Sequence, residues 1–187
     1  ADVLGREEAV HVVDAADLTP IATGVAYNGI SNFQLRYSSS CIGLCFVAPV
    51  HLPAGASVQY IEIDYYDGSA SGEVQANLGV CDITGESCAF QATDAGCATS
   101  ICSGVGFAPG FSLSSGSFST PFTVDNFLAK YELFAGNTSP DGSTAISQII
   151  IGYRLQVSAA PALPTFTDVP TNSIYYQFIE ALAAAGI

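Results

Sequence analysis

The stretch AISQIIIGYRLQV, residues Ala145 to Val157, is the longest candidate β-strand of the chain. It is rich in the β-branched and aromatic residues that favour strands, and we expect it to lie centrally in a sheet. Before it, from about residue 21, short runs of the same kind alternate with clusters of Gly, Ser, Asn, Asp and Pro, which are typical of turns. We expect strands near residues 22–28, 32–38, 44–51, 57–66, 73–82, 87–92, 116–124, 127–136 and 144–157. Eight or nine strands with such turns predict an all-β fold, a jelly-roll-like two-sheet β-sandwich.

The chain divides into four segments by composition. Residues 1–20 are expected to form an acidic N-terminal extended arm, and residues 21–158 the β-sandwich domain. Residues 159–165 form a linker rich in Pro and Ala, which is short enough to act as a semi-rigid spacer. Residues 166–187 are expected to form a helical segment.

This last segment predicts one short amphipathic helix. After Pro170, the side chain of Thr171, Asn172 or Ser173 can cap a helix by accepting a hydrogen bond from its first N–H groups. The apolar residues that follow fall on one stripe of the helix. They are Ile174, Phe178, Ile179 and Leu182.

Several motifs in this chain resemble those of a known family. The segment FTDVP at 166–170, the aromatic pair Tyr175–Tyr176, IEAL at 179–182 and AAGI at 184–187 together resemble the opening of an S-layer homology domain. That family anchors extracellular proteins to the bacterial envelope. The segments at 48–67, 123–134 and 150–157 are similar to strand joints of secreted bacterial sandwich proteins. The resemblance implies a secreted bacterial protein located outside the cell or at the cell surface.

Six cysteines occur as three pairs that are close in sequence: Cys41 and Cys45, Cys81 and Cys88, Cys97 and Cys102. An even number of cysteines in a chain of secreted character favours disulfides over a zinc site. We expect Cys81–Cys88 and Cys97–Cys102 to close short turns, which leaves Cys41–Cys45. Two residues four apart on a straight strand are too distant to bond, so this last pair requires a bend, which Gly43 permits.

Charge and hydropathy exclude several functions. The chain of 187 residues has a formal net charge of −13, which argues against binding nucleic acid or anionic membranes. Apolar residues make up 49% of it and charged residues 11%, as in a packed globular protein. No apolar run is long enough to predict a transmembrane segment.

Few residues point to chemistry. His11 and His51 are the only histidines, and no motif places a nucleophile beside either, so we predict that the protein is not an enzyme. Asp64, Asp67 and Glu73 cluster around a Gly/Ser loop and are a weak calcium candidate, with no other cofactor predicted.

Aromatic residues raise the possibility of sugar binding. Tyr60, Tyr65, Tyr66 and Tyr131 lie on or near expected strands and could stack on a sugar, although about half should face the core. Asn137-Thr138-Ser139 fits an N-glycosylation acceptor, and a plain surface turn explains it as well.

The two ends of the chain indicate self-association. An isolated short helix is unstable in water, so its apolar stripe, together with Phe166, must pack against this chain's own sandwich or against a second copy. Val10, Val12 and Val13 of the arm could add a strand to a neighbour's sheet or form the first strand of their own. We therefore predict a structural subunit of an extracellular filament or surface layer, joined through its terminal segments. The alternative is a surface-tethered carbohydrate-binding module, and a cell-envelope polymer or glycan is a possible partner.

Overall fold

The long strand predicted near the end of the domain is strand β12, Thr144–Leu155, which pairs antiparallel with β6, Ala56–Asp67. Opposed residues of the two strands share a face of the sheet, so that Ile63 lies opposite Ile149 and Ile61 opposite Ile151. All four side chains are fully buried. Packing between such β-branched neighbours stabilises the ladder. This pair forms the centre of one sheet, as the sequence predicts.

The computed structural model describes residues 8–30, 35–95, 97, 99–103, 108–140, 142–155, 163–173 and 175–184. Its strands form two six-stranded sheets, which we call sheet A and sheet B. Sheet A has the order β10 (Ala108–Thr123), β6, β12, β4 (Leu35–Ser38) and β3 (Tyr27–Ile30), with β1 (Glu8–Asp14) also paired to β12. Sheet B has the order β2 (Thr19–Pro20), β5 (Gly43–Pro49), β11 (Ala129–Asn137), β7 (Val74–Asp82) and β8 (Cys88–Phe90), with β9 (Ile101–Cys102) also paired to β7.

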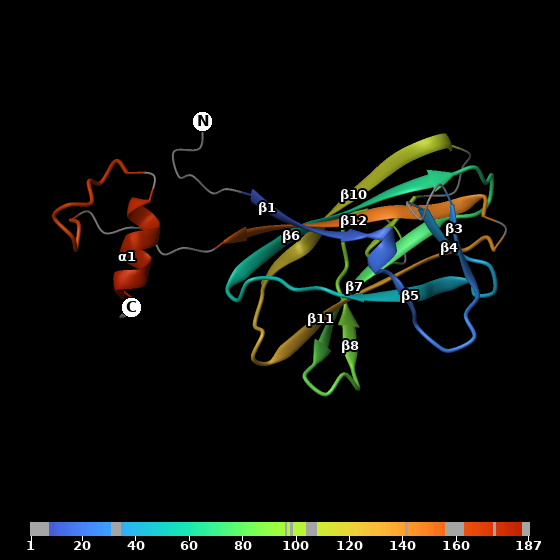
Figure 1. Cartoon of the computed structure of the whole chain (residues 1–187), viewed down its shortest axis with the longest axis horizontal. Coiled ribbons are helices and arrows are strands. Elements are labelled where there is room, and N and C mark those ends of the chain that lie inside the picture. Colours follow the sequence, from blue (N-terminus) through green and yellow to red (C-terminus); the bar gives the residue numbers. More distant parts are fainter. Residues whose placement is uncertain are drawn as a thin grey trace.

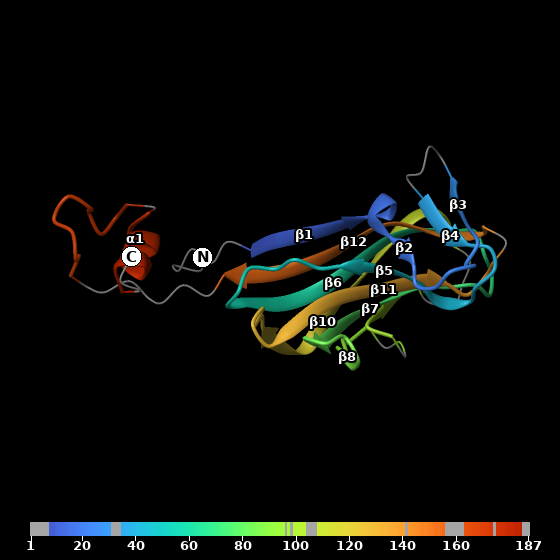
Figure 2. The same ribbon diagram turned by 60° about the horizontal axis from the view of Figure 1, so that its bottom comes forward.

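The two sheets pack face to face around one hydrophobic core (Figures 1 and 2). The chain passes repeatedly from one sheet to the other, from β5 to β6 to β7 and from β10 to β11 to β12. Sheet B contributes the fully buried Phe46, Leu78 and Leu133 to the core opposite the isoleucines of sheet A. The architecture is therefore the jelly-roll-like sandwich that the sequence predicts.

Residues 8–20 belong to this sandwich, which corrects the extended arm expected over residues 1–20. Strand β1 pairs with β12 from Glu8 opposite Arg154 to Asp14 opposite Gln148. The 3₁₀ turn η1, Ala15–Asp17, follows, and reciprocal hydrogen bonds between Asp14 and Asp17 fix it. The expected arm is thus the first strand of its own sandwich, the second of the two alternatives given above. It pairs there because β12 offers an edge that no other strand occupies over these residues. Residues 1–7 lie outside the described part of the chain.

Three disulfides join the six cysteines in the expected pairs, Cys41–Cys45, Cys81–Cys88 and Cys97–Cys102. The bend required by the first pair is present: Gly43 has φ +94°, and the Cα atoms of Cys41 and Cys45 lie 5.9 Å apart. Disulfides of this number are typical of proteins that mature in an oxidising environment.

The strand boundaries differ from the sequence prediction most at β10. This strand begins at Ala108, not near residue 116, and it runs along most of β6. Its first half is rich in Ser, Gly and Pro, which have low strand propensity, so its conformation depends on pairing with β6. Most of the run expected at 22–28 is outside a strand, and the short strands β2 and β9 were not predicted.

The C-terminal segment contains the predicted helix, α1, Tyr176–Ala184. The Ser173 hydroxyl accepts a hydrogen bond from the Tyr175 N–H at 3.2 Å, which fits one of the predicted caps. The carboxylate of Glu180, nearly fully buried, accepts bonds from the N–H and hydroxyl of Thr165, each at 2.7 Å, and so holds the preceding loop on the helix. The segment lies beyond one end of the sandwich in both views (Figures 1 and 2). No helix in the described part of the chain is long and apolar enough to cross a membrane.

At Gly136, β11 lies close to the backbone of β5. A Cβ atom built on Gly136 would lie 1.7 Å from the carbonyl oxygen of Gly43, which is backbone and cannot turn away. At Gly152 the three atoms nearest to a Cβ atom all belong to the ring of Tyr60, a partly exposed side chain that can rotate. We expect Gly136→Ala to lower the free energy of unfolding by about 1–3 kcal/mol or more, and Gly152→Ala to lower it by less. Urea denaturation measures both, and an unchanged stability of Gly136→Ala would contradict this packing.

Candidate functional site

The outer face of sheet A is the side turned away from sheet B. The register of the four adjacent strands β10, β6, β12 and β1 determines which residues share it, because opposed residues point to the same side. Its residues, which define the outer face below, are Phe111, Leu113, Ser115 and Ser117 of β10, Tyr60, Glu62, Asp64 and Tyr66 of β6, Gln148, Ile150, Gly152 and Arg154 of β12, and Glu8, Val10, Val12 and Asp14 of β1.

An aromatic ring lies against the backbone in the middle of this face. Tyr60 is opposite Gly152, and a Cβ atom at Gly152 would be only 1.9 Å from Cε1 of the tyrosine. The ring therefore occupies the space above the glycine. Burial raises the pKa of Tyr60, and the carboxylates of Glu8 and Glu62 raise it further. The ring thus lies beside negative charge on a partly exposed surface.

Two carboxylates follow Tyr60 along β6. Asp64 accepts a hydrogen bond from Nε2 of Gln148 at 2.5 Å, which fixes its position on the sheet. Burial raises the pKa of Glu62 above its usual range, and the nearby charge of Asp64 adds to this shift. These two acids and the amide present both acceptors and donors for polar groups of a ligand.

One edge of the face is apolar and hollowed. Phe111 packs edge-on against Tyr66, with ring centroids 6.1 Å apart. A surface hollow of about 430 Å³ next to this pair is lined by Asp64, Phe111, Ser112, Leu113 and Ser147. Phe111 is 72% exposed and Leu113 60% exposed. Large apolar side chains at this edge are therefore in contact with water.

Of the four tyrosines that could stack on a sugar, only Tyr60 and Tyr66 lie on the outer face. Tyr65 and Tyr131 are buried in the core, and the hydroxyl of Tyr131 accepts a bond from the N–H of Asp125 at 2.8 Å. The alternation of β6 separates neighbouring tyrosines onto opposite faces.

The calcium candidate does not form a cluster. Asp64 and Asp67 are three residues apart on one strand, so they point to opposite faces, and Asp67 is buried. The carboxylate of Asp67 accepts bonds from the N–H of Ser69 and the hydroxyl of Ser103, whereas Glu73 lies in the loop before β7.

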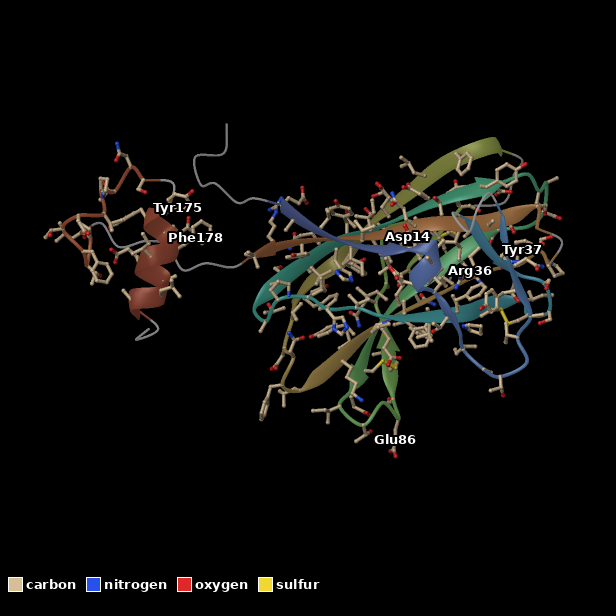
Figure 3. All side chains as sticks on the ribbon, in the orientation of Figure 1. Asp14, Arg36, Tyr37, Glu86, Tyr175 and Phe178 are labelled. Carbon is tan, nitrogen blue, oxygen red and sulfur yellow. A yellow bond between two sulfur atoms is a disulfide. The ribbon has the colours of Figure 1, made fainter. Side chains whose placement is uncertain are left out.

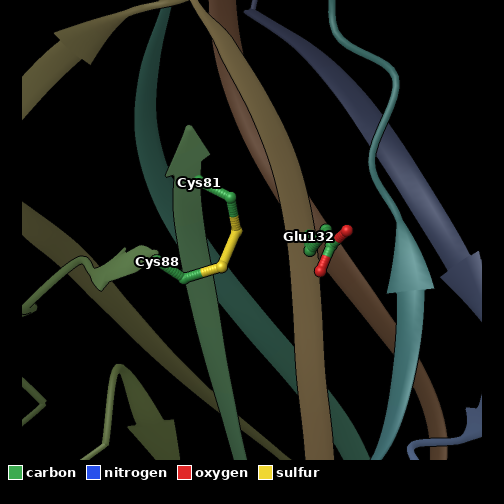
Figure 4. Close-up of side chains that lie close together, drawn as sticks. All are labelled: Cys81, Cys88 and Glu132. Carbon is green, nitrogen blue, oxygen red and sulfur yellow. A yellow bond between two sulfur atoms is a disulfide. The ribbon is translucent and has the colours of Figure 1, made fainter. Parts of the chain in front are cut away.

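Among the described residues, only Cys81, Cys88 and Glu132 bring three candidate metal ligands within 4.8 Å of one another (Figure 4). Both sulfur atoms belong to the Cys81–Cys88 disulfide. A disulfide sulfur is not a thiolate ligand, so this group does not offer a metal site while the bond is intact.

The candidate catalytic histidine His11 and the candidate glycosylation acceptor Asn137 do not lie on the outer face. His11 faces the interior side of β1, and burial lowers its pKa; His51 nearby lowers it further, against the opposite effect of Asp17.

Asn137 is fully buried, with its amide bonded to the backbone of Ser38, so the folded chain does not present it as a glycosylation acceptor.

The residues predicted to contact other subunits divide into two groups. Val13 is buried in this chain's own core, whereas Val10 and Val12 on the outer face are 51% and 46% exposed. In the C-terminal segment, Phe166, Phe178 and Leu182 are exposed and Ile179 is half-buried, and Phe178 projects from the segment with Tyr175 (Figure 3). Ile174 lies outside the described residues.

Sequence reasoning missed the apolar edge of β10 and the contribution of Gln148, Ile150 and Gly152. The alternation Tyr60, Glu62, Asp64, Tyr66 was a signal for one polar face of β6. Which strands flank it depends on pairing between distant segments, which alternation alone does not determine.

No family model and no curated protein matches the chain. Solved structures similar to it include the C-terminal CBM6 of LamC, a marine laminarinase from Zobellia galactanivorans (10% identity, TM-score 0.42, covering 76% of this chain and 98% of that one). A second is the capsid of cyanophage Pam1 (13% identity, TM-score 0.38, covering 83% of this chain and 90% of that one). A third is an exo-β-1,3-galactanase from Phanerochaete chrysosporium (10% identity, TM-score 0.39, covering 76% of this chain and 29% of that one). These similarities concern the fold alone.

The raised pKa of Glu62 predicts a pH dependence of stability. As pH rises from about 4.5, the unfolded chain releases this proton before the folded chain does, so the folded state loses stability through the window above 4.5. Glu62→Gln cannot titrate. We expect the free energy of unfolding of Glu62→Gln, minus that of wild type, to be larger at pH 7 than at pH 4. Urea denaturation at both values tests this, and a constant or reversed difference would contradict it.

Proposed function

We propose that the protein is a structural subunit of an extracellular bacterial assembly, a filament or a surface layer. Copies contact one another through the edge of sheet A at β1 and through the C-terminal segment. The proposed role is not enzymatic.

The observation on which this proposal rests is the exposure of apolar side chains near both ends of the chain. Val10 and Val12 lie about half exposed on a strand at the edge of a sheet. Phe166, Phe178 and Leu182 are exposed to 43%, 46% and 51% on a short helical segment that extends beyond the sandwich. Fully burying a side chain of this size stabilises by about 1.5–3 kcal/mol. Association of copies would cover both groups.

Composition supports an extracellular location. Three disulfides cross-link the sandwich, and the chain has only 4 lysine and arginine residues in total. The similarity of residues 166–187 to the opening of an S-layer homology domain supports a place at the bacterial surface. We propose that this segment contributes to attachment as well as to contacts between copies.

The assembly can be tested directly on the oxidised chain. We expect sedimentation velocity and electron microscopy to detect polymers whose size grows with protein concentration. Replacing Phe178 and Leu182 by serine should raise the concentration needed for assembly by about tenfold, because it removes apolar contacts. Ile83→Ser, at an exposed site in the β7–β8 turn, serves as the control. A wild-type chain that remains monomeric at every concentration contradicts the proposal.

A second candidate function is carbohydrate binding on the outer face. The ring of Tyr60 over Gly152, on the same face as Glu62, Asp64 and Gln148, supports it, because sugars stack on aromatic rings and bond to carboxylates and amides.

Glycan arrays and polysaccharide pull-downs test this second function. We expect Tyr60→Ala to lower the affinity about tenfold if the ring is the platform. Tyr175→Ala is the control, since Tyr175 is also an aromatic side chain in contact with solvent but lies in the C-terminal segment. No binding to any glycan, or equal losses in both variants, would exclude the outer face as a sugar site.

A further inference from the structure

We infer that sheet A continues from one copy of this chain to the next, with β1 of one copy pairing antiparallel with β10 of its neighbour. This inference rests on the proposed structural function and specifies the contact. The partner is a second copy of this chain, and the surfaces are the two opposite edges of a single sheet.

Each of the two edge strands has a side without a strand partner in the described part of the chain. In the described part of the chain, β1 pairs with β12 alone, so its other side has no strand partner over Glu8–Asp14. Strand β10 forms the opposite edge and pairs with β6. Residues 117–119 of β10 are covered by bonds to residues 92–94, whereas Phe111–Ser115 show no second strand among the described residues. An unpaired strand edge is a template for another strand.

Strand directions favour this junction. β10, β6, β12 and β1 are each antiparallel to the next, so directions alternate across the sheet. With four alternating strands, β1 and β10 run in opposite directions. A neighbour placed in the same orientation therefore presents its β10 antiparallel to β1, and the alternation continues without inverting the copy.

Exposed apolar residues of the two edges would meet at this junction. Val10 and Val12 lie on the outer face at alternate positions of β1, and Phe111 and Leu113 lie on the same face of β10. All four are 46% to 72% exposed within one copy. Pairing the edges places these side chains next to each other as cross-strand neighbours, which stabilises a ladder. One contact thus covers both apolar edges.

The distribution of charge favours pairing of β1 with β10 over pairing of two β1 strands. Strand β1 has acids at both ends, and an antiparallel pair of two β1 strands centred on His11 would place Glu8 opposite Asp14 twice. Like charges in opposed positions are destabilising. The 16 residues of β10 carry no charge, so β10 can accept β1 without this repulsion. A contact between two different surfaces of one chain is heterologous, and it propagates into an open filament when the rotation between copies does not close a ring.

Two lysine variants test the inference. Val12→Lys blocks the β1 edge and leaves β10 intact, and Leu113→Lys does the reverse, because the buried lysine would lack a partner at the junction. We expect each variant alone to raise the concentration needed for assembly by about tenfold or more. In chains that also carry Phe178→Ser and Leu182→Ser, and so lack the C-terminal contact, an equimolar mixture should form heterodimers and stop there, since only one intact β1 and one intact β10 remain to meet. Sedimentation velocity and mass photometry measure the species.

The controls separate this contact from the general function. Ile83→Lys introduces the same charge at an exposed site outside sheet A and should assemble as wild type does. Circular dichroism verifies folding, and Val10→Lys and Phe111→Lys replace a variant that fails to fold. Homodimers of either lysine variant in the background that lacks the C-terminal contact, or normal assembly of both single variants, overturn the β1–β10 junction while the structural function stands. A monomeric wild type at all concentrations overturns both.

Discussion

The pairing of β6 with β12 is the interaction on which the rest of the structure depends. These two long strands bury isoleucines on one side and present the outer face on the other. Every other position in sheet A is defined relative to them, because β10 attaches to the free side of β6, and β1 and β4 attach to β12. The pairing of the core strands thus determines that β10 and β1 lie at edges of sheet A, where their exposed side chains can contact another molecule.

The sequence predicts those parts of the fold that depend on local pattern. The long apolar run of β12 and the short cysteine spacings sufficed for the central strand and for three disulfides. The role of β1 could not be decided, because Val10, Val12 and Val13 show the same pattern whether their partner strand belongs to this chain or another. The first half of β10 was missed because its strand conformation comes from pairing with β6 and not from its Ser- and Gly-rich sequence.

The candidate site was predictable only where one strand determined it. The alternation of Tyr60, Glu62 and Asp64 places these residues on one face, whereas Asp67, three residues beyond Asp64, falls on the other. This period explains why acids close in sequence did not form a calcium site. Gln148, which bonds Asp64, comes from 84 residues away, and only the register of β6 on β12 brings the two together.

Net charge limits how copies of this chain can associate. Each copy has a formal charge of −13, so two copies repel at long range, and physiological salt screens this repulsion beyond about 8 Å. A stable contact must therefore gain its energy at short range, from backbone pairing and apolar packing, on surfaces that do not oppose carboxylates. Much of the outer face fails this condition because Glu62 and Asp64 occupy its middle. Its two margins meet the condition, since Leu113 and Phe111 on one edge and Val10 and Val12 on the other are apolar and exposed. The central carboxylates then remain facing solvent along the assembled sheet, where they are accessible to a polar ligand.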